Sequence, residues 1–161
     1  MSGIKSSGRN AGTSTEISVD VPAFLPDDFI PDTGQRLEFY RRLAQASDED
    51  AIRAIEAELE DRYGRLPDEA QLLREVMIDK TLVRKIGARG YELGPVRMVL
   101  SLGADPRLDP AKVMKLIQRK DSRWKLSPDM RASYAFTEVE REDRMAAART
   151  RLREILGCVA G

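Results

Sequence analysis

The sequence predicts a single α+β domain, in which a small antiparallel sheet of two hairpins packs with about five helices. Three observations support this class. Apolar residues recur at helical spacing through residues 33–86, strand-like apolar segments flank turn signals in 89–103 and 122–136, and a helical pattern returns after residue 137. With 161 residues, of which 42% are hydrophobic and 34% charged, the chain is long enough for one domain with a buried core.

The first fifteen residues, MSGIKSSGRNAGTST, are rich in Gly, Ser, Thr and Asn and contain almost no apolar side chains. This composition is typical of a flexible leader or linker. Residues 16–21, EISVDV, then alternate apolar and polar side chains with the period of a half-buried strand, until Pro22 interrupts the pattern. We expect an edge strand here, a domain spanning residues 16–157 and a short tail at 158–161.

The first helix is predicted to begin at Asp32. Pro31 disfavours helical geometry at the residue before it, and Asp32 is a good N-cap. Gln35, three residues further on, could complete a capping box. The inward side of this helix is expected to carry Leu37, Tyr40 and Leu43.

Two more helices are predicted before residue 88. One starts at Ser47, has acidic residues in its first turn and ends at Gly64; its inward stripe is Ile52, Ile55, Leu59 and Tyr63. The next starts at Pro67 and ends at Gly87; its apolar side is Leu72, Leu73, Val76, Met77, Val83 and Ile86.

The remaining chain predicts two hairpins and two helices. The first hairpin spans residues 89–103 with its turn at Gly94–Pro95, and a short helix begins at Asp109–Pro110. The second hairpin spans residues 122–136 and turns at residues 127–129. Thr137 and Glu140 then form the pattern of a capping box for a last helix, which is expected to end near Gly157.

The composition excludes several classes of catalytic site. The chain contains no histidine and a single cysteine, Cys158, so it cannot form a zinc cluster, a Cys–His nucleophile or a Ser-His-Asp triad. It also lacks a GxxxxGK[ST] phosphate loop and a GxSxG elbow. We therefore expect no enzyme activity and no cofactor for this chain. One thiol cannot form an internal disulfide, which fits a reducing cytoplasm.

The aspartates of LPDDFIPD, residues 25–32, are candidate ligands for Mg²⁺, which prefers oxygen donors. A local structural role explains them better. Asp32 serves as an N-cap, and Asp27 and Asp28 follow Pro26, where they favour a turn. The sequence therefore predicts no metal site here.

Charge is distributed unevenly along the chain, although the net charge is zero. Residues 25–70 carry 13 acidic and 6 basic side chains, whereas residues 71–161 carry 12 acidic and 19 basic ones. The asymmetry is compatible with docking on charged partners and equally with attraction inside the folded domain.

One basic segment, residues 112–125, is a candidate nucleic-acid contact because Lys and Arg neutralise phosphates and an aromatic ring can stack on a base. The same spacing fits a solvated helix face, and Trp124 lies where a strand would bury it. The candidate residues are Lys112, Lys115, Arg119, Lys120 and Arg123.

Glu58 and Asp61 form a second candidate site. They are three residues apart on the second predicted helix, so their side chains are neighbours that point away from its apolar stripe and could receive arginines from another surface. The alternative is local pairing within the helix, since Arg62 and Arg65 each follow one of the carboxylates by four residues.

Three motifs in this half of the chain, LPDDFIPD, RLEFYRRLA and ELEDRYGRLPDEAQLL, resemble a known family. The resemblance runs from about residue 16 to residue 157, and it is to the C-terminal (TRCF) domain of bacterial transcription-repair coupling factor (Mfd). The full proteins of that family are ATP-dependent DNA translocases that displace stalled RNA polymerase and recruit nucleotide excision repair through UvrA. The translocase motor has no counterpart in the matched part.

The resemblance implies a regulatory domain of a cytoplasmic protein. Such a domain docks on the UvrB-like module of the same factor, masks the surface that binds UvrA, and keeps the factor inactive until it engages RNA polymerase. A carboxylate pair in the helix before the G-LPD turn faces arginines of that module in the family, and the pair falls on Glu58 and Asp61. The alternative function is that of a nucleic-acid-binding accessory domain that uses residues 112–125.

Overall fold

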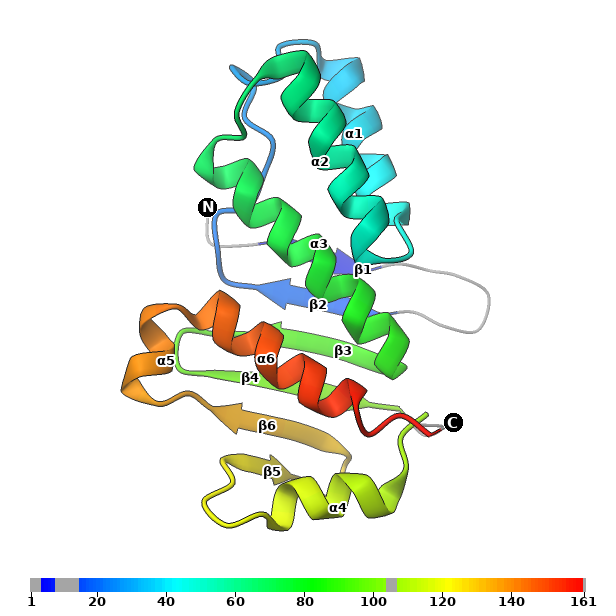
Figure 1. The fold of residues 1–161 in the computed structure, drawn as a ribbon, viewed down its shortest axis with the longest axis vertical. Coiled ribbons are helices and arrows are strands. Elements are labelled where there is room, and N and C mark those ends of the chain that lie inside the picture. Colours follow the sequence, from blue (N-terminus) through cyan, green and yellow to red (C-terminus); the bar gives the residue numbers. More distant parts are fainter. Residues whose placement is uncertain (1–3, 8–14, 104–106, 161) are drawn as a thin grey trace. The chain divides into compact units, whose positions relative to one another are not determined.

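The computed structural model describes residues 4–7, 15–103 and 107–160. Along these residues six helices and six strands form, so the α+β class is confirmed (Figure 1). The chain packs as two compact units. The first, here called the helical unit, is built mainly on Val21–Thr81, and the second, the sheet unit, on the chain before Val21 together with the chain after Thr81.

The helical unit contains α1 (Thr33–Gln45), α2 (Glu49–Tyr63) and the greater part of α3 (Asp68–Ile86). As predicted, Asp32 caps α1: its carboxylate accepts hydrogen bonds from the amides of Gly34 (2.8 Å) and Gln35 (3.3 Å). Gln35 does not turn back to the cap, because its side chain accepts from Arg62 on α2 at 3.5 Å. The second helix was predicted to start at Ser47 but begins at Glu49, because Asp48 is its N-cap: the carboxylate of Asp48 accepts from the Ala51 amide at 2.8 Å.

The inward side of α1 differs from the prediction. Phe39 and Leu43 are its buried residues, whereas Leu37 is 62% exposed. The reason is the position of α2, which lies beside α1 in Figure 1. The Phe39 ring meets the Tyr63 ring edge-on, with centroids 6.3 Å apart. The hydroxyl of Tyr40 instead accepts from the Leu25 amide at 2.7 Å. On α2 the predicted residues Ile52, Ile55 and Leu59 are buried, and Tyr63, the fourth, is half-buried.

The sheet unit contains one sheet with strand order β1-β2-β3-β4-β6-β5. Its strands are β1 (Ile4–Ser7), β2 (Glu16–Val19), β3 (Ala88–Leu93), β4 (Arg97–Leu102), β5 (Trp124–Leu126) and β6 (Arg131–Ala135). Both predicted hairpins form, β3/β4 and β5/β6, and β4 pairs with β6 to join them. The sheet is mixed rather than antiparallel because β2 runs parallel to β3. More than 60 residues separate these two strands, and a long connection of this kind allows a parallel return.

Strand β1 changes two expectations about the N-terminus. It lies beyond β2 in the strand order, so β2 is not an edge strand. It also places Ile4–Ser7 in the sheet although this segment was expected to be part of a flexible leader. An edge strand pairs through its main chain, and this pairing does not require an apolar sequence. The rest of the expected leader, apart from Thr15, lies outside the described residues.

Helices α4 (Pro110–Gln118), α5 (Glu138–Glu142) and α6 (Arg144–Leu156) complete the sheet unit. The capping box of Thr137 and Glu140 is confirmed, with hydrogen bonds of 3.1 and 3.0 Å. The last helix is split in two, however. Asp143, with φ −137°, ends α5 and then caps α6 by accepting from the Ala146 amide at 3.3 Å.

The core of the sheet unit lies between the sheet and its helices. The buried residues of the sheet include Tyr91, Met98 and Leu100, and α6 contributes Leu152 and Ile155. The expected tail is tied to the chain before α4, because the Asp109 amide donates to the carbonyl of Cys158 at 2.8 Å. Of the helices in the described part of the chain, none is long and apolar enough to cross a membrane.

Candidate protein-interaction surface

The two predicted interface residues lie on α2, away from its buried stripe. Glu58 is half-buried and Asp61 is exposed. They lie close to the C-terminal end of the helix, which stops at Gly64, a residue with φ +91°. A positive φ favours glycine, which explains why the helix ends there. The structure therefore presents both carboxylates on one side of α2, as the spacing predicted.

Glu58 is held by an arginine that its sequence neighbourhood did not reveal. Arg42 of α1 donates two hydrogen bonds to it, from Nη1 to Oε2 at 2.9 Å and from Nη2 to Oε1 at 2.8 Å. The hydrogen bonds from Arg42 lower the pKa of Glu58 and raise that of Arg42 itself. The two residues are 16 positions apart, and only the antiparallel packing of α1 on α2 brings them together.

The ring of Phe39 supports this ion pair. The guanidinium of Arg42 lies over the ring at 5.1 Å from its centroid, and that of Arg62 at 5.8 Å. Arg62 also approaches Glu58, with 3.8 Å between Nη2 and Oε2. One of the two local pairs considered from the sequence, Glu58 with Arg62, is therefore present. Glu58 thus has two cationic neighbours, both stacked on one aromatic ring.

Asp61 has a different environment. It is exposed, and the described residues supply neither a hydrogen bond nor an ion pair to its side chain, including from Arg65. Other carboxylates of the helical unit are already paired with arginines. Glu38 pairs with Arg41, and Glu56 pairs with Arg53 and Arg74. Several carboxylates of this region are therefore already paired, whereas Asp61 is left available to another surface.

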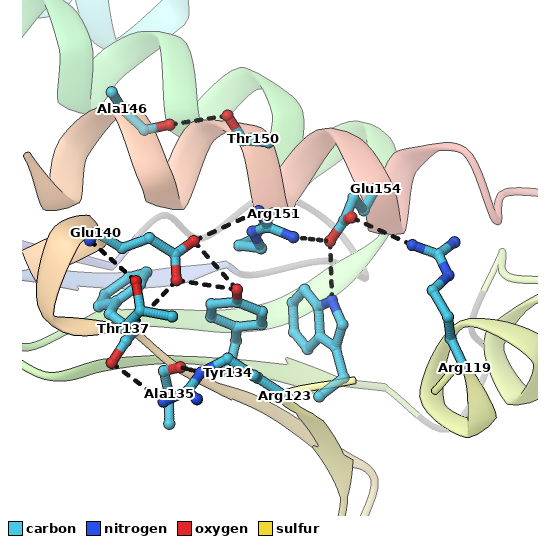
Figure 2. Close-up of polar contacts among 12 residues, drawn as sticks. Arg119, Arg123, Tyr134, Ala135, Thr137, Glu140, Ala146, Thr150, Arg151 and Glu154 are labelled. Carbon is cyan, nitrogen blue, oxygen red and sulfur yellow. Dashed lines mark hydrogen bonds and ion pairs between the residues drawn. The ribbon is translucent and has the colours of Figure 1, made fainter. Parts of the chain in front are cut away.

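The basic segment of residues 112–125 contains exposed lysines and two arginines that have partners within the sheet unit. Lys112, Lys115 and Lys120 are exposed. Arg119 lies 3.8 Å from Glu154 of α6, and Arg123 donates to the carbonyls of Ala135 (2.5 Å) and Phe136 (3.3 Å), as Figure 2 shows. Arg123 is thus held by main-chain carbonyls of the unit, whereas Arg119 is 64% exposed and its ion pair with Glu154 is long.

Trp124 is not available for stacking on a base. It is 4% exposed, packs edge-on against Tyr134 with centroids 5.3 Å apart, and donates from Nε1 to Glu154 at 3.1 Å. The position of Trp124 in a buried strand was one of the two alternatives that the sequence left open. The structure favours that alternative.

A polar cluster beneath α6 was not predicted (Figure 2). Glu140 accepts from the hydroxyl of Tyr134 at 3.0 Å and lies 3.4 Å from Arg151, which in turn donates to Glu154 at 2.9 Å. The guanidinium of Arg151 lies 4.7 Å from the centroid of the Tyr134 ring. Its members bind one another, although Arg151 Nε is buried without a hydrogen-bond partner among the described residues. We assign the cluster to holding α5 and α6 against β6.

No metal-binding group was found among the residues that the structure describes, when His, Cys, Asp and Glu are considered in sets of three or more. Asp32 caps α1, as described above. Asp27 and Asp28 lie in the turn before it and are exposed.

The chain is similar in sequence to known transcription-repair-coupling factors. The model of the TRCF domain family matches residues 19–113. The chain is 40% identical over 144 residues to the transcription-repair-coupling factor of Myxococcus xanthus and 33% identical over 141 residues to that of Escherichia coli strain K12. These matches cover 89% and 88% of the chain but only 12% of each relative, so the chain spans about an eighth of their length.

A solved structure, described as the C-terminal domain of transcription-repair coupling factor, has the same fold. The two structures superpose with a TM-score of 0.69 at 19% sequence identity, over 88% of this chain and 87% of the other.

Proposed function

The chain belongs to the TRCF domain family, and from this premise we propose that it is an autoinhibitory protein-interaction domain of a transcription-repair coupling factor. Residues 16–157 form this domain in our proposal. It docks on the UvrB-like module of the same factor and masks the surface through which that module binds UvrA. The complete factor would act in the cytoplasm on stalled RNA polymerase, with its ATP-dependent translocase activity in other parts of the protein.

The observation that carries this proposal is the unpaired, exposed carboxylate of Asp61 beside Glu58 on one side of α2. An arginine of a partner can bind such a carboxylate through a charge-assisted hydrogen bond. Ala54 and Ala57, each four residues before one of the two carboxylates, are also exposed. Side chains of this size let the backbone of a partner approach closely, so that its arginines can reach Glu58 and Asp61.

The proposed domain has no enzyme activity of its own. The sequence contains no phosphate-binding loop, and its single cysteine, Cys158, is buried. Its role would be to control access to a neighbouring module by competing for the same surface. Such a mechanism requires an interface that is specific and yet weak enough to be released, and an interface based on a few charged contacts meets both conditions.

A titration of a purified UvrB-like module of the family with this chain tests the docking. Reversal of both charges, Glu58→Lys with Asp61→Lys, should weaken binding at least tenfold, since it places like charges opposite the partner's arginines. The matched control reverses two exposed carboxylates outside α2, Asp27→Lys with Asp28→Lys, and should bind like wild type.

Circular dichroism verifies that both variants are folded. Neither Glu58 nor Asp61 belongs to the buried stripe of α2, so we expect the helical signal to be retained. Equal affinities of the wild type, the α2 variant and the control would remove Glu58 and Asp61 from the interface.

A further inference from the structure

The position of Arg42 has a consequence for docking. We propose that Arg42 is an internal competitor for Glu58, so that the docking partner must displace it before a partner arginine can bind this carboxylate. The inference rests on the proposed function and adds a residue that limits the affinity of the interface. Asp61, which has no competitor of this kind in the described part of the chain, would be available from the first encounter.

The geometry of the pair supports competition. The two nitrogens of the Arg42 fork bind the two oxygens of Glu58, at 2.8 and 2.9 Å. A planar guanidinium and a carboxylate match best in this two-point arrangement, and a carboxylate engaged in it cannot offer the same arrangement to a second arginine. An arginine of the partner would therefore meet Glu58 with its best binding geometry already occupied.

The charges around Glu58 also disfavour the binding of an arginine from the partner. Glu58 carries one negative charge, and the guanidiniums of Arg42 and Arg62 both lie within ion-pair distance of it. An incoming arginine is repelled by both of these cations. Removal of Arg42 would leave one carboxylate beside one guanidinium, and the repulsion would fall.

Displacement of Arg42 is feasible because the pair is open to solvent. The side chains of Arg42 and Glu58 are 33% and 34% exposed. Ion pairs between partly exposed side chains are weak, since hydration of the separated charges replaces much of the lost attraction. The guanidinium of Arg42 also has an alternative partner, because it can stay stacked on the ring of Phe39 when it leaves Glu58.

Arg41 provides a matched control. It lies next to Arg42 on α1, is likewise a cation, and pairs with Glu38 rather than with Glu58. Arg42→Gln and Arg41→Gln therefore remove the same charge from the same helix. Only the first releases Glu58 from its two-point pair with Arg42. Titration of a purified UvrB-like module should show that Arg42→Gln binds about threefold to fivefold more tightly than Arg41→Gln, the range expected for loss of a competing surface ion pair.

A second variant distinguishes the loss of the competing interaction from an effect of misfolding. Arg42→Lys keeps the charge but loses the two-point geometry, so its affinity should lie between those of wild type and Arg42→Gln. Thermal unfolding of each variant identifies any loss of structure.

Each other outcome overturns the inference in a recognisable way. Equal affinities of Arg42→Gln and Arg41→Gln would show that Arg42 does not compete, and weaker binding of a folded Arg42→Gln would show that Arg42 positions Glu58 for the partner. In both cases Asp61→Asn would still weaken docking if the proposed function holds. A wild-type chain that does not bind the module would overturn the proposed function together with the inference.

Discussion

At the residue scale, Phe39 connects the core of the helical unit to its charged surface. Its side chain is 1% exposed, and its ring contacts Tyr63 as well as the guanidiniums of Arg42 and Arg62. We predict that Phe39→Ala lowers the free energy of unfolding by about 3–5 kcal/mol, the usual cost of removing a buried aromatic ring. Leu37→Ala on the same helix should change it by less than about 0.5 kcal/mol, because Leu37 is 62% exposed. Urea denaturation compares the two, and similar losses would contradict the assignment of Phe39 to the core.

Single residues also show which features of the structure could be predicted from the sequence. The caps at Asp32, Asp109 and Thr137 were predictable because an N-cap depends on local geometry. The inward side of α1 was not, because two sets of apolar residues fit the period of a helix and only the position of α2 selects Phe39 over Leu37. The same limit applies to the Arg42–Glu58 pair. It links residues 16 positions apart, and no local spacing rule relates them.

At the scale of elements, the cluster of Figure 2 ties α5 and α6 to the sheet through Glu140. Burial alone would raise the pKa of Glu140, but hydrogen bonds from the Thr137 amide and the Tyr134 hydroxyl, with the charge of Arg151, outweigh it and hold the pKa below its ordinary value. A carboxylate with a lowered pKa stabilises the folded chain above its unfolded pKa. This stability is lost as the pH falls through the folded pKa.

We therefore predict that Glu140→Gln is destabilising at neutral pH and that its difference from wild type shrinks as the pH falls from about 6 to about 3. Denaturation by urea at a series of pH values measures this difference. Glu138→Gln, an exposed position in the same helix, serves as the control and should show little effect at any pH. A difference between Glu140→Gln and wild type that stays constant with pH would refute a role for the ionised carboxylate.

Exposed lysines lie on α4 and in the turn that follows it, and their contribution can be tested separately. Because Arg119 and Arg123 are engaged within the sheet unit, the informative variant changes Lys112, Lys115 and Lys120 to Gln. We predict that this variant docks on the UvrB-like module as wild type does. We also predict that neither protein binds duplex or single-stranded DNA more tightly than the ~10⁻⁴ to 10⁻⁶ M typical of non-specific contacts at physiological salt.

Fluorescence anisotropy with labelled DNA measures this binding. Tighter binding by wild type that the three substitutions abolish would instead support the accessory nucleic-acid function.

The elements themselves were predicted more reliably than their connections. Both hairpins and the three helices before residue 88 were expected from periodicity and turn residues. The parallel pairing of β2 with β3 was not, since partners so far apart in the chain are selected by tertiary packing. The break between α5 and α6 was missed because the helical pattern continues across Asp143, whose non-helical backbone and capping side chain start a second helix.

At the scale of the whole molecule, the role that we propose is control of a longer protein by this domain. The chain spans 12% of the Myxococcus xanthus and Escherichia coli relatives, so the proposed masking of the UvrA-binding surface can be tested only in a complete factor. The sequence motifs located the family, and the structure adds that Asp61 is free whereas Glu58 is held by Arg42. Docking should therefore depend on a surface of α2 that the fold keeps accessible.

The most direct test measures UvrA binding by a full-length factor that carries this domain, with both α2 charges reversed. We predict that wild type binds UvrA weakly, that Glu58→Lys with Asp61→Lys binds it at least tenfold more tightly, and that Asp27→Lys with Asp28→Lys behaves as wild type. Surface plasmon resonance with immobilised UvrA gives the three affinities. A folded α2 variant that binds UvrA no better than wild type would contradict autoinhibition through this surface.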